Sequence, residues 1–139
     1  LPLMGHLART ARDVPVWLCH GTDADPTLRQ TWEGLGATLI PCDVTGGHLD
    51  PLSVLKGLGA AGLTRVFCEG GGALAASLLQ ADLVDELVGM TAGLAIGAEG
   101  LPSLGALGLA RLAEAPRFRL RETRALDGDV LHVWERSKS

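Results

Sequence analysis

Short apolar runs and longer stretches with helix signals follow one another along the chain. The apolar runs, each bounded by turn-forming residues, predict β-strands at residues 14–20, 37–40, 66–68 and 87–92. Helical spacing or helix-capping residues predict α-helices at residues 26–35, 51–60 and 73–80. Asp25 and Asp50 are candidate N-caps for the first two helices, and each is followed by a proline, which favours the first helical position.

The order of these elements predicts an α/β fold. Strands that alternate with helices over the first ninety residues are typical of crossover units, so we expect a mostly parallel sheet flanked by helices. Residues 118–123 and 130–134 alternate in polarity around Asp127-Gly128-Asp129, which predicts a closing antiparallel hairpin. The glycine-rich residues 93–108 predict a loop with a short helix, and no repeat divides the chain, so we expect one domain over residues 1–139.

Composition and charge exclude several classes of protein. The 139 residues are 47% apolar and 20% charged, as in a globular domain. No apolar run reaches the roughly 18 residues that a membrane-spanning helix needs. The net charge of −4 argues against nucleic acid as a partner. One cluster of basic side chains lies on a predicted strand, and its spacing predicts a solvated face: Arg117, Arg119, Arg121 and Arg124.

Cysteines and histidines give no sign of a disulfide framework or a metal site. Cys19, Cys42 and Cys68 lie in apolar runs, which predicts reduced, buried thiols and a cytoplasmic protein. The four histidines lack metal-ligand spacing. Pro41-Cys42 begins like the P-C-x-x-C element of zinc deaminases, but Thr45 stands at the second cysteine position and no H-x-E is present.

The glycine run Gly70-Gly71-Gly72 between a predicted strand and a predicted helix is the main candidate for a binding site. Glycines admit an anion close to the backbone, and the free N–H groups of a helix start favour negative charge. Gly70-x-Gly72-x-x-Ala75 also matches the looser dinucleotide fingerprint, although a chain with 19 glycines meets this spacing by chance. The alternative is a tight turn that packs a helix on a strand.

Two features distinguish this run from an ordinary Rossmann site. It comes midway along the chain, and the next acidic residues, Asp82 and Asp85, arrive too soon to bind a ribose. Glu69 directly precedes the glycines, where its carboxylate would repel a phosphate. We therefore expect Glu69 to face a different ligand group, one that donates hydrogen bonds.

The stretch VFCEGGGALAASLLQADLVDELVG, which starts at Val66, resembles the reductase domain of the bifunctional riboflavin-biosynthesis deaminase/reductase, a family with a dihydrofolate-reductase-like fold. An apolar strand, E-G-G, a helix of small residues and L-V-D-E-L follow one another as in that family. The opening LPLMGHLARTARDVPVWLCHG is also similar to a segment of it, so the resemblance covers essentially the whole chain.

The resemblance implies an NADPH-dependent reduction of 5-amino-6-(5-phosphoribosylamino)uracil to its ribitylamino form, in a homodimer or higher homo-oligomer. It implies that Glu69 contacts the substrate, and it names no catalytic residue. The residues implied to bind the NADPH pyrophosphate are Gly71, Gly72, Ala73, Leu74, Ala75, Ala76 and Ser77.

Some elements of the family have no counterpart here: the S-L-D-G, T-x-x-x-D-D-P and L-D-S segments. We therefore expect the chain to be the C-terminal part of a pyrimidine reductase domain and to be inactive alone. Two alternatives stay open: a nucleotide-binding regulatory or assembly module without catalysis, and a fragment of a Rossmann-type NAD(P) dehydrogenase.

Overall fold

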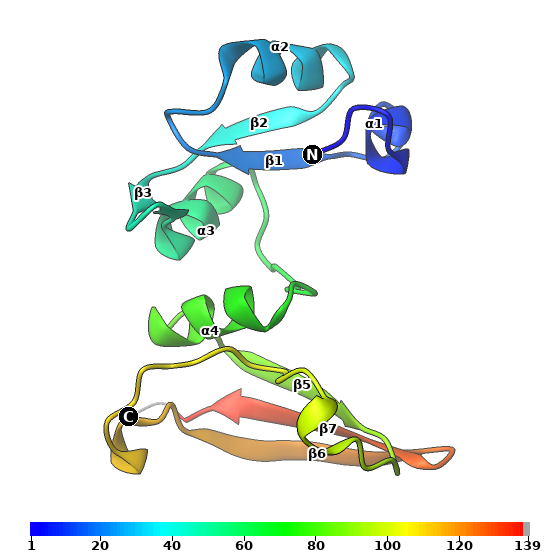
Figure 1. Ribbon diagram of the computed structural model, residues 1–139, viewed down its shortest axis with the longest axis vertical. Coiled ribbons are helices and arrows are strands. Elements are labelled where there is room, and N and C mark those ends of the chain that lie inside the picture. The colour runs from blue at the N-terminus through cyan, green and yellow to red at the C-terminus, as the bar shows by residue number, and fades with distance from the viewer. Residues whose placement is uncertain (138–139) are drawn as a thin grey trace. The chain divides into compact units, whose positions relative to one another are not determined.

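The computed structural model describes residues 1–137 (Figure 1). The chain divides into two compact units, Leu1–Phe67 and Cys68–Ser139. Both mix helices and strands, as predicted for an α/β protein. None of the helices in residues 1–137 is long and apolar enough to cross a membrane.

The first unit is built on a parallel pair of strands with a helix between them in sequence. Its elements are α1 (His6–Thr10), β1 (Trp17–His20), α2 (Pro26–Gly34), β2 (Thr38–Pro41), β3 (Val44–Thr45), β4 (His48–Leu49) and α3 (Pro51–Ala60). Leu18 of β1 lies opposite Leu39 of β2 in the parallel register, so the predicted crossover unit is confirmed. Within this unit, α2 and α3 lie on opposite faces of the strand pair (Figure 1).

The two predicted helix starts are confirmed at atomic level. The carboxylate of Asp25 accepts a hydrogen bond from the Thr27 N–H, and that of Asp50 accepts one from the Ser53 N–H, both at 2.8 Å. Such caps satisfy donors that the first turn of a helix leaves free, and each stabilises its helix by about 1 kcal/mol. The sequence did not predict α1, which has no side-chain cap.

Alternation along the strands places a different set of side chains against each helix. Leu18 and Leu39 pack against a buried cluster that includes Trp32 of α2 and Ala8 of α1. Ile40 is buried and points the other way, as adjacent strand residues must. A Cβ on Gly57 of α3 would lie 2.5 Å from Ile40 Cγ2, so this glycine brings α3 close to the sheet.

The second unit consists of a helix and an antiparallel sheet. Its elements are α4 (Gly72–Gln80), β5 (Glu86–Thr91), the 3-10 turns η1 (Gly97–Glu99) and η2 (Leu112–Glu114), β6 (Phe118–Leu126) and β7 (Asp129–Arg136). The strand order is β5-β7-β6. The predicted hairpin is confirmed: Asp127 and Gly128, both with positive φ, form its two-residue turn.

The prediction of a mostly parallel sheet does not hold in residues 1–137. Only β1 and β2 pair in parallel, and the other ladders are antiparallel. Residues 66–68, predicted as a strand, are irregular, and Val66 and Phe67 are 49% and 75% exposed. The apolar run was identified correctly, but a strand also needs a neighbouring strand to satisfy its backbone, and no described segment pairs with residues 66–68.

The charged residues of the sheet satisfy one another. Arg119 pairs with Glu135 at 2.5 Å, and Arg121 contacts both Glu135 and Glu86. The predicted solvated basic face is confirmed, since all four arginines are exposed: Arg117, Arg119, Arg121 and Arg124. Glu86 is the first residue of β5, and the carbonyl of Asp85, the residue before it, accepts a hydrogen bond from the Arg136 N–H at 2.8 Å.

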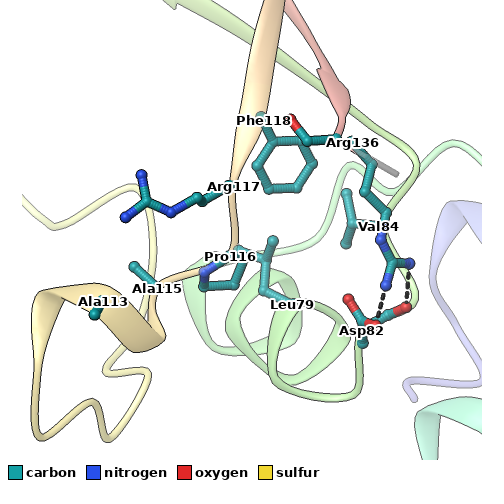
Figure 2. Close-up of a pocket in the computed structure, with 10 residues that line it drawn as sticks. Leu79, Asp82, Val84, Ala113, Ala115, Pro116, Arg117, Phe118 and Arg136 are labelled. Carbon is teal, nitrogen blue, oxygen red and sulfur yellow. Dashed lines mark hydrogen bonds and ion pairs between the residues drawn. The ribbon is translucent and has the colours of Figure 1, made fainter. Parts of the chain in front are cut away.

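Arg136, at the end of β7, ties the sheet to the end of α4. Its guanidinium donates to the carbonyl of Asp82 at 2.5 Å and also pairs with the carboxylate of the same residue (Figure 2). Asp82 has a φ of 60°, a left-handed conformation that aspartate tolerates better than most residues. This contact joins residues 54 positions apart and fixes the connection between helix and sheet.

Candidate functional site

The residues predicted to bind substrate and cofactor all lie in the second unit, around the start of α4. Glu69 is exposed and lies two residues before Gly71, the N-cap of this helix. The carboxylate is held by an irregular segment, not by a strand end as the sequence predicted. The structure therefore places the carboxylate and the glycines next to each other at an open helix start.

Helix α4 begins with free hydrogen-bond donors. No side chain caps it, and its first backbone hydrogen bond runs from the Ala75 N–H to the Gly71 carbonyl at 3.2 Å. The N–H groups of Gly72, Ala73 and Leu74 have no acceptor within residues 1–137. These donors and the positive end of the helix dipole make the helix start attractive to an anion.

The three glycines of the run have different surroundings. A Cβ on Gly70 would lie 2.6 Å from Leu74 Cδ2, and one on Gly72 would lie 3.1 Å from each of three backbone atoms in residues 102–105. A Cβ on Gly71 would meet nothing within 4 Å. Gly72 is therefore a packing glycine, but it packs on residues 102–105 and not on a strand, as the alternative had it. Gly70 meets only the flexible, exposed side chain of Leu74, and Gly71 borders free space where a ligand can approach the backbone.

The other residues predicted to bind the cofactor differ in their exposure to solvent. Ala73 and Leu74 are exposed on the first turn, whereas Ala76 is only 4% exposed and faces the interior. The Ser77 hydroxyl donates to the Leu74 carbonyl at 2.8 Å, the local contact expected of a serine within a helix. The first turn thus offers backbone donors to a ligand, while the second turn packs.

Residues 102–106 form a segment that packs along α4, a contact that the sequence did not predict. The Gly105 N–H donates to the Gly72 carbonyl at 2.9 Å, and the Gln80 side chain donates to the Ala106 carbonyl at 3.3 Å. The sequence predicted only a glycine-rich loop here, because its spacing has no period that pairs it with a helix. Residues 102–106 are therefore the part of the candidate site's surroundings that the sequence did not predict.

A cavity of about 310 Å³ lies at the opposite end of α4. Leu79, Asp82, Phe118 and Arg136 line it, whereas neither Glu69 nor Gly71 does (Figure 2). Since it contains neither the exposed carboxylate nor the free N–H groups, we do not assign the candidate site to it.

The sequence predicted that all three cysteines are buried, and this prediction is wrong for Cys68. Cys42 is buried and Cys19 half-buried, whereas Cys68 is exposed because the strand predicted around it does not form. Burial, together with the neighbouring Cys42 thiol, raises the pKa of Cys19 from 9.0 to about 11. Residues 1–137 contain no cluster of three histidine, cysteine or acidic side chains that could hold a metal ion.

Comparison with known proteins shows the family to which the chain belongs. A family model described as the RibD C-terminal domain matches residues 6–132. The chain belongs to this family.

Individual relatives agree with this assignment. The chain is 39% identical over 88 residues to the riboflavin biosynthesis protein RibD of Escherichia coli strain K12, an alignment that covers 63% of this chain and 24% of that protein. The structure is similar to that of Acinetobacter baumannii RibD, with a TM-score of 0.74 and 22% identity over 99% of this chain and 35% of the other. A pyrimidine reductase-like protein from Corynebacterium diphtheriae gives a TM-score of 0.70 and 18% identity over 88% and 50% of the two chains.

These relatives are longer than the chain, which spans between about a quarter and a half of their lengths. The two structures, both under 25% identical, share the fold of this chain.

Proposed function

We propose that this chain is the cofactor-binding part of an NADPH-dependent pyrimidine reductase of riboflavin biosynthesis, with 5-amino-6-(5-phosphoribosylamino)uracil as the substrate. One observation carries the proposal: an exposed carboxylate, Glu69, lies two residues from an uncapped helix start, inside the region that matches the RibD C-terminal family. Neighbouring sites of opposite polarity suit two ligands that react with each other.

The helix start fits a pyrophosphate. Three free N–H groups, the open space beside Gly71 and the positive end of α4 all favour an anion with several oxygens. In the proposal, Gly71, Gly72, Ala73 and Leu74 bind through their backbone. Ala75, Ala76 and Ser77 hold the helix in place and bring no further polar side chain to the phosphates.

Glu69 fits the substrate, since a carboxylate accepts hydrogen bonds and repels phosphate. NADPH, when bound, supplies a hydride for the opening of the ribose ring. The proposed task of the chain is to hold the cofactor by its phosphates and to orient donor groups of the pyrimidine or sugar against Glu69. Such positioning accounts for much of the rate of a two-ligand reaction.

The experiment that tests this function is an NADPH titration followed by cofactor fluorescence, with NADH as competitor. We would titrate the 139-residue chain and the longest chain that its gene encodes, and then assay the longer chain with the pyrimidine substrate. Saturable binding that prefers NADPH, with turnover in the longer chain, supports the reductase. Binding without turnover favours the nucleotide-binding module, and a preference for NADH favours the dehydrogenase.

We also propose that the protein is a homodimer or higher homo-oligomer in the cytoplasm. The three-stranded sheet leaves β5 and β6 as free edges within residues 1–137, and such edges commonly pair with another strand. Sedimentation equilibrium of the longest encoded chain measures the oligomeric state directly, and a monomer at all concentrations contradicts this part of the proposal.

A further inference from the structure

The contact between Gly105 and the first turn of α4 is made by backbone on both sides. The Gly105 N–H donates to the Gly72 carbonyl at 2.9 Å. From the other direction, a Cβ built on Gly72 would lie 3.1 Å from the Gly105 nitrogen and equally close to the carbonyl oxygens of Pro102 and Ser103. The two glycines therefore share one interface, in which neither has room for a side chain.

The space at Gly105 is limited by the helix itself. A Cβ there would lie 3.2 Å from the Gly72 oxygen, 3.3 Å from Ala73 Cα and 3.4 Å from Ala76 Cβ. These atoms belong to the backbone or lie directly on it, so they cannot rotate away as the end of a long side chain can. An added methyl group must push residues 102–105 and the first turn of α4 apart by a few tenths of an ångström.

The position of this turn matters because it carries the free donors. Residues 102–105 cover the Gly72 side of the turn, while the Gly71 side is open. Hydrogen bonds to a phosphate depend steeply on donor angle and distance, so a small displacement of the turn weakens several of them together.

We propose that Gly105 is a positioning residue of the cofactor site: its N–H and its missing side chain set the direction of the Gly72, Ala73 and Leu74 donors toward the pyrophosphate. This inference rests on the proposed function, since it assumes that the helix start binds phosphates. Gly105 itself touches helix α4 and is not a ligand of the cofactor.

Gly105→Ala tests the inference, with Gly93→Ala as the matched control in the same loop region. A Cβ on Gly93 would have its nearest neighbour, the Gly128 oxygen, at an ordinary 3.5 Å. We expect Gly105→Ala to weaken the binding of NADPH and of inorganic pyrophosphate by about tenfold, roughly the loss of one charge-assisted hydrogen bond. Gly93→Ala should bind both as the wild type does. Melting curves establish that each variant is folded at the titration temperature.

Two further measurements separate positioning from a general loss of stability. In the longest encoded chain, Gly105→Ala should raise the KM for NADPH and leave kcat and the KM for the pyrimidine unchanged. In the wild type, the Gly105 amide should exchange with solvent hydrogen much more slowly than an open-chain amide, because it is bonded to the Gly72 carbonyl.

Equal affinities of Gly105→Ala and Gly93→Ala for NADPH overturn the inference and leave the proposed function intact. Hydrogen exchange at the Gly105 amide that is as fast as in an unstructured peptide also overturns the inference. A wild-type protein that binds neither NADPH nor pyrophosphate overturns the proposed function, and the positioning role with it.

Discussion

The imidazole of His132 lies directly over Gly89 on the neighbouring strand of the sheet. A Cβ on Gly89 would be 2.1 Å from His132 Cε1, far inside van der Waals contact. The ring is held there from two sides: Trp134 Nε1–H donates to His132 Nδ1 at 2.8 Å, and His132 Nε2 lies 3.3 Å from Thr91 Oγ1. Because Nδ1 accepts, the neutral ring carries its proton on Nε2. Gly89 therefore provides the space in which this hydrogen-bonded chain fits.

Gly89→Ala is expected to destabilise the protein by about 1–3 kcal/mol, the usual cost of forcing a side chain into a filled space. The new methyl group must displace the His132 ring and break its hydrogen bond with Trp134. Denaturant unfolding followed by tryptophan fluorescence measures the change.

A double-mutant cycle identifies the cause of that loss. In a His132→Ala background the space over residue 89 is empty, so Gly89→Ala should cost much less there, and the two changes should not add. Strict additivity would show that the methyl group and the ring do not compete.

Local chemistry explains which parts of the fold the sequence predicted correctly. Asp25 and Asp50, each before a proline, predicted two helix starts because a cap acts within three residues. Asp127-Gly128 predicted the hairpin for the same reason, since only a few residues adopt the positive φ that its turn requires. By contrast, the strand at residues 66–68 depends on a pairing partner elsewhere, which no local pattern specifies.

For the candidate site, too, the sequence predicted the local features and missed those that depend on distant contacts. The glycine run predicted the helix start of α4, and the structure has it within one residue. That Gly71 is open while Gly72 packs on residues 102–105 depends on a contact with residues about thirty positions away along the chain, which the spacing of glycines does not reveal.

The three cysteines should react with a thiol reagent at very different rates. At pH 8 the exposed Cys68 should be alkylated first, whereas Cys42 is buried and Cys19 half-buried. Because the pKa of Cys19 is raised from 9.0 to about 11, its thiolate fraction in the folded protein should increase only as the pH approaches that value. Peptide mass spectrometry after timed alkylation between pH 8 and pH 10 gives the order, and modification of Cys19 before Cys68 at pH 8 contradicts it.

The same shift has a consequence for stability. Well below pH 9.0 the Cys19 thiol is protonated in both the folded and the unfolded chain, so its contribution to the free energy of unfolding is constant. Between pH 9.0 and about 11 the unfolded chain releases this proton while the folded chain retains it, so the contribution of Cys19 should decrease as the pH rises. Cys19→Ser removes the thiol, and its unfolding free energy should depend less on pH in this range.

Glu69→Gln should separate the binding of the two ligands. The carboxylate is exposed, so the substitution should leave the melting temperature and the affinity for NADPH nearly unchanged. If Glu69 accepts a hydrogen bond from the substrate, replacing the charged acceptor should raise the KM for the pyrimidine by about tenfold or more. Steady-state kinetics of the longest encoded chain measure this effect, with Glu99→Gln, an exposed glutamate in η1, as the control. Weaker NADPH binding by Glu69→Gln would show that this carboxylate serves the cofactor instead.

Gly71→Asp should separate the stability of α4 from the function of its first turn. Gly71 is the N-cap, has ordinary extended backbone angles and has nothing within 4 Å of its Cβ position, so an aspartate fits there. As a cap, its carboxylate accepts from the free N–H groups and should stabilise the helix by a few tenths of a kcal/mol. The same carboxylate occupies the donors that a phosphate would use and repels it, so NADPH affinity should fall by more than tenfold.

Gly71→Asn is the matched control for charge, because asparagine caps a helix about as well without a negative charge. It should lose less affinity than Gly71→Asp, and raising the ionic strength should narrow the difference between the two variants. Fluorescence titration of NADPH at two salt concentrations, beside thermal melting of both variants, tests these expectations together. A stabilised Gly71→Asp variant with wild-type affinity would mean that the phosphates do not bind at the start of α4, and that the glycine run serves only the turn and the packing of Gly72 on residues 102–105.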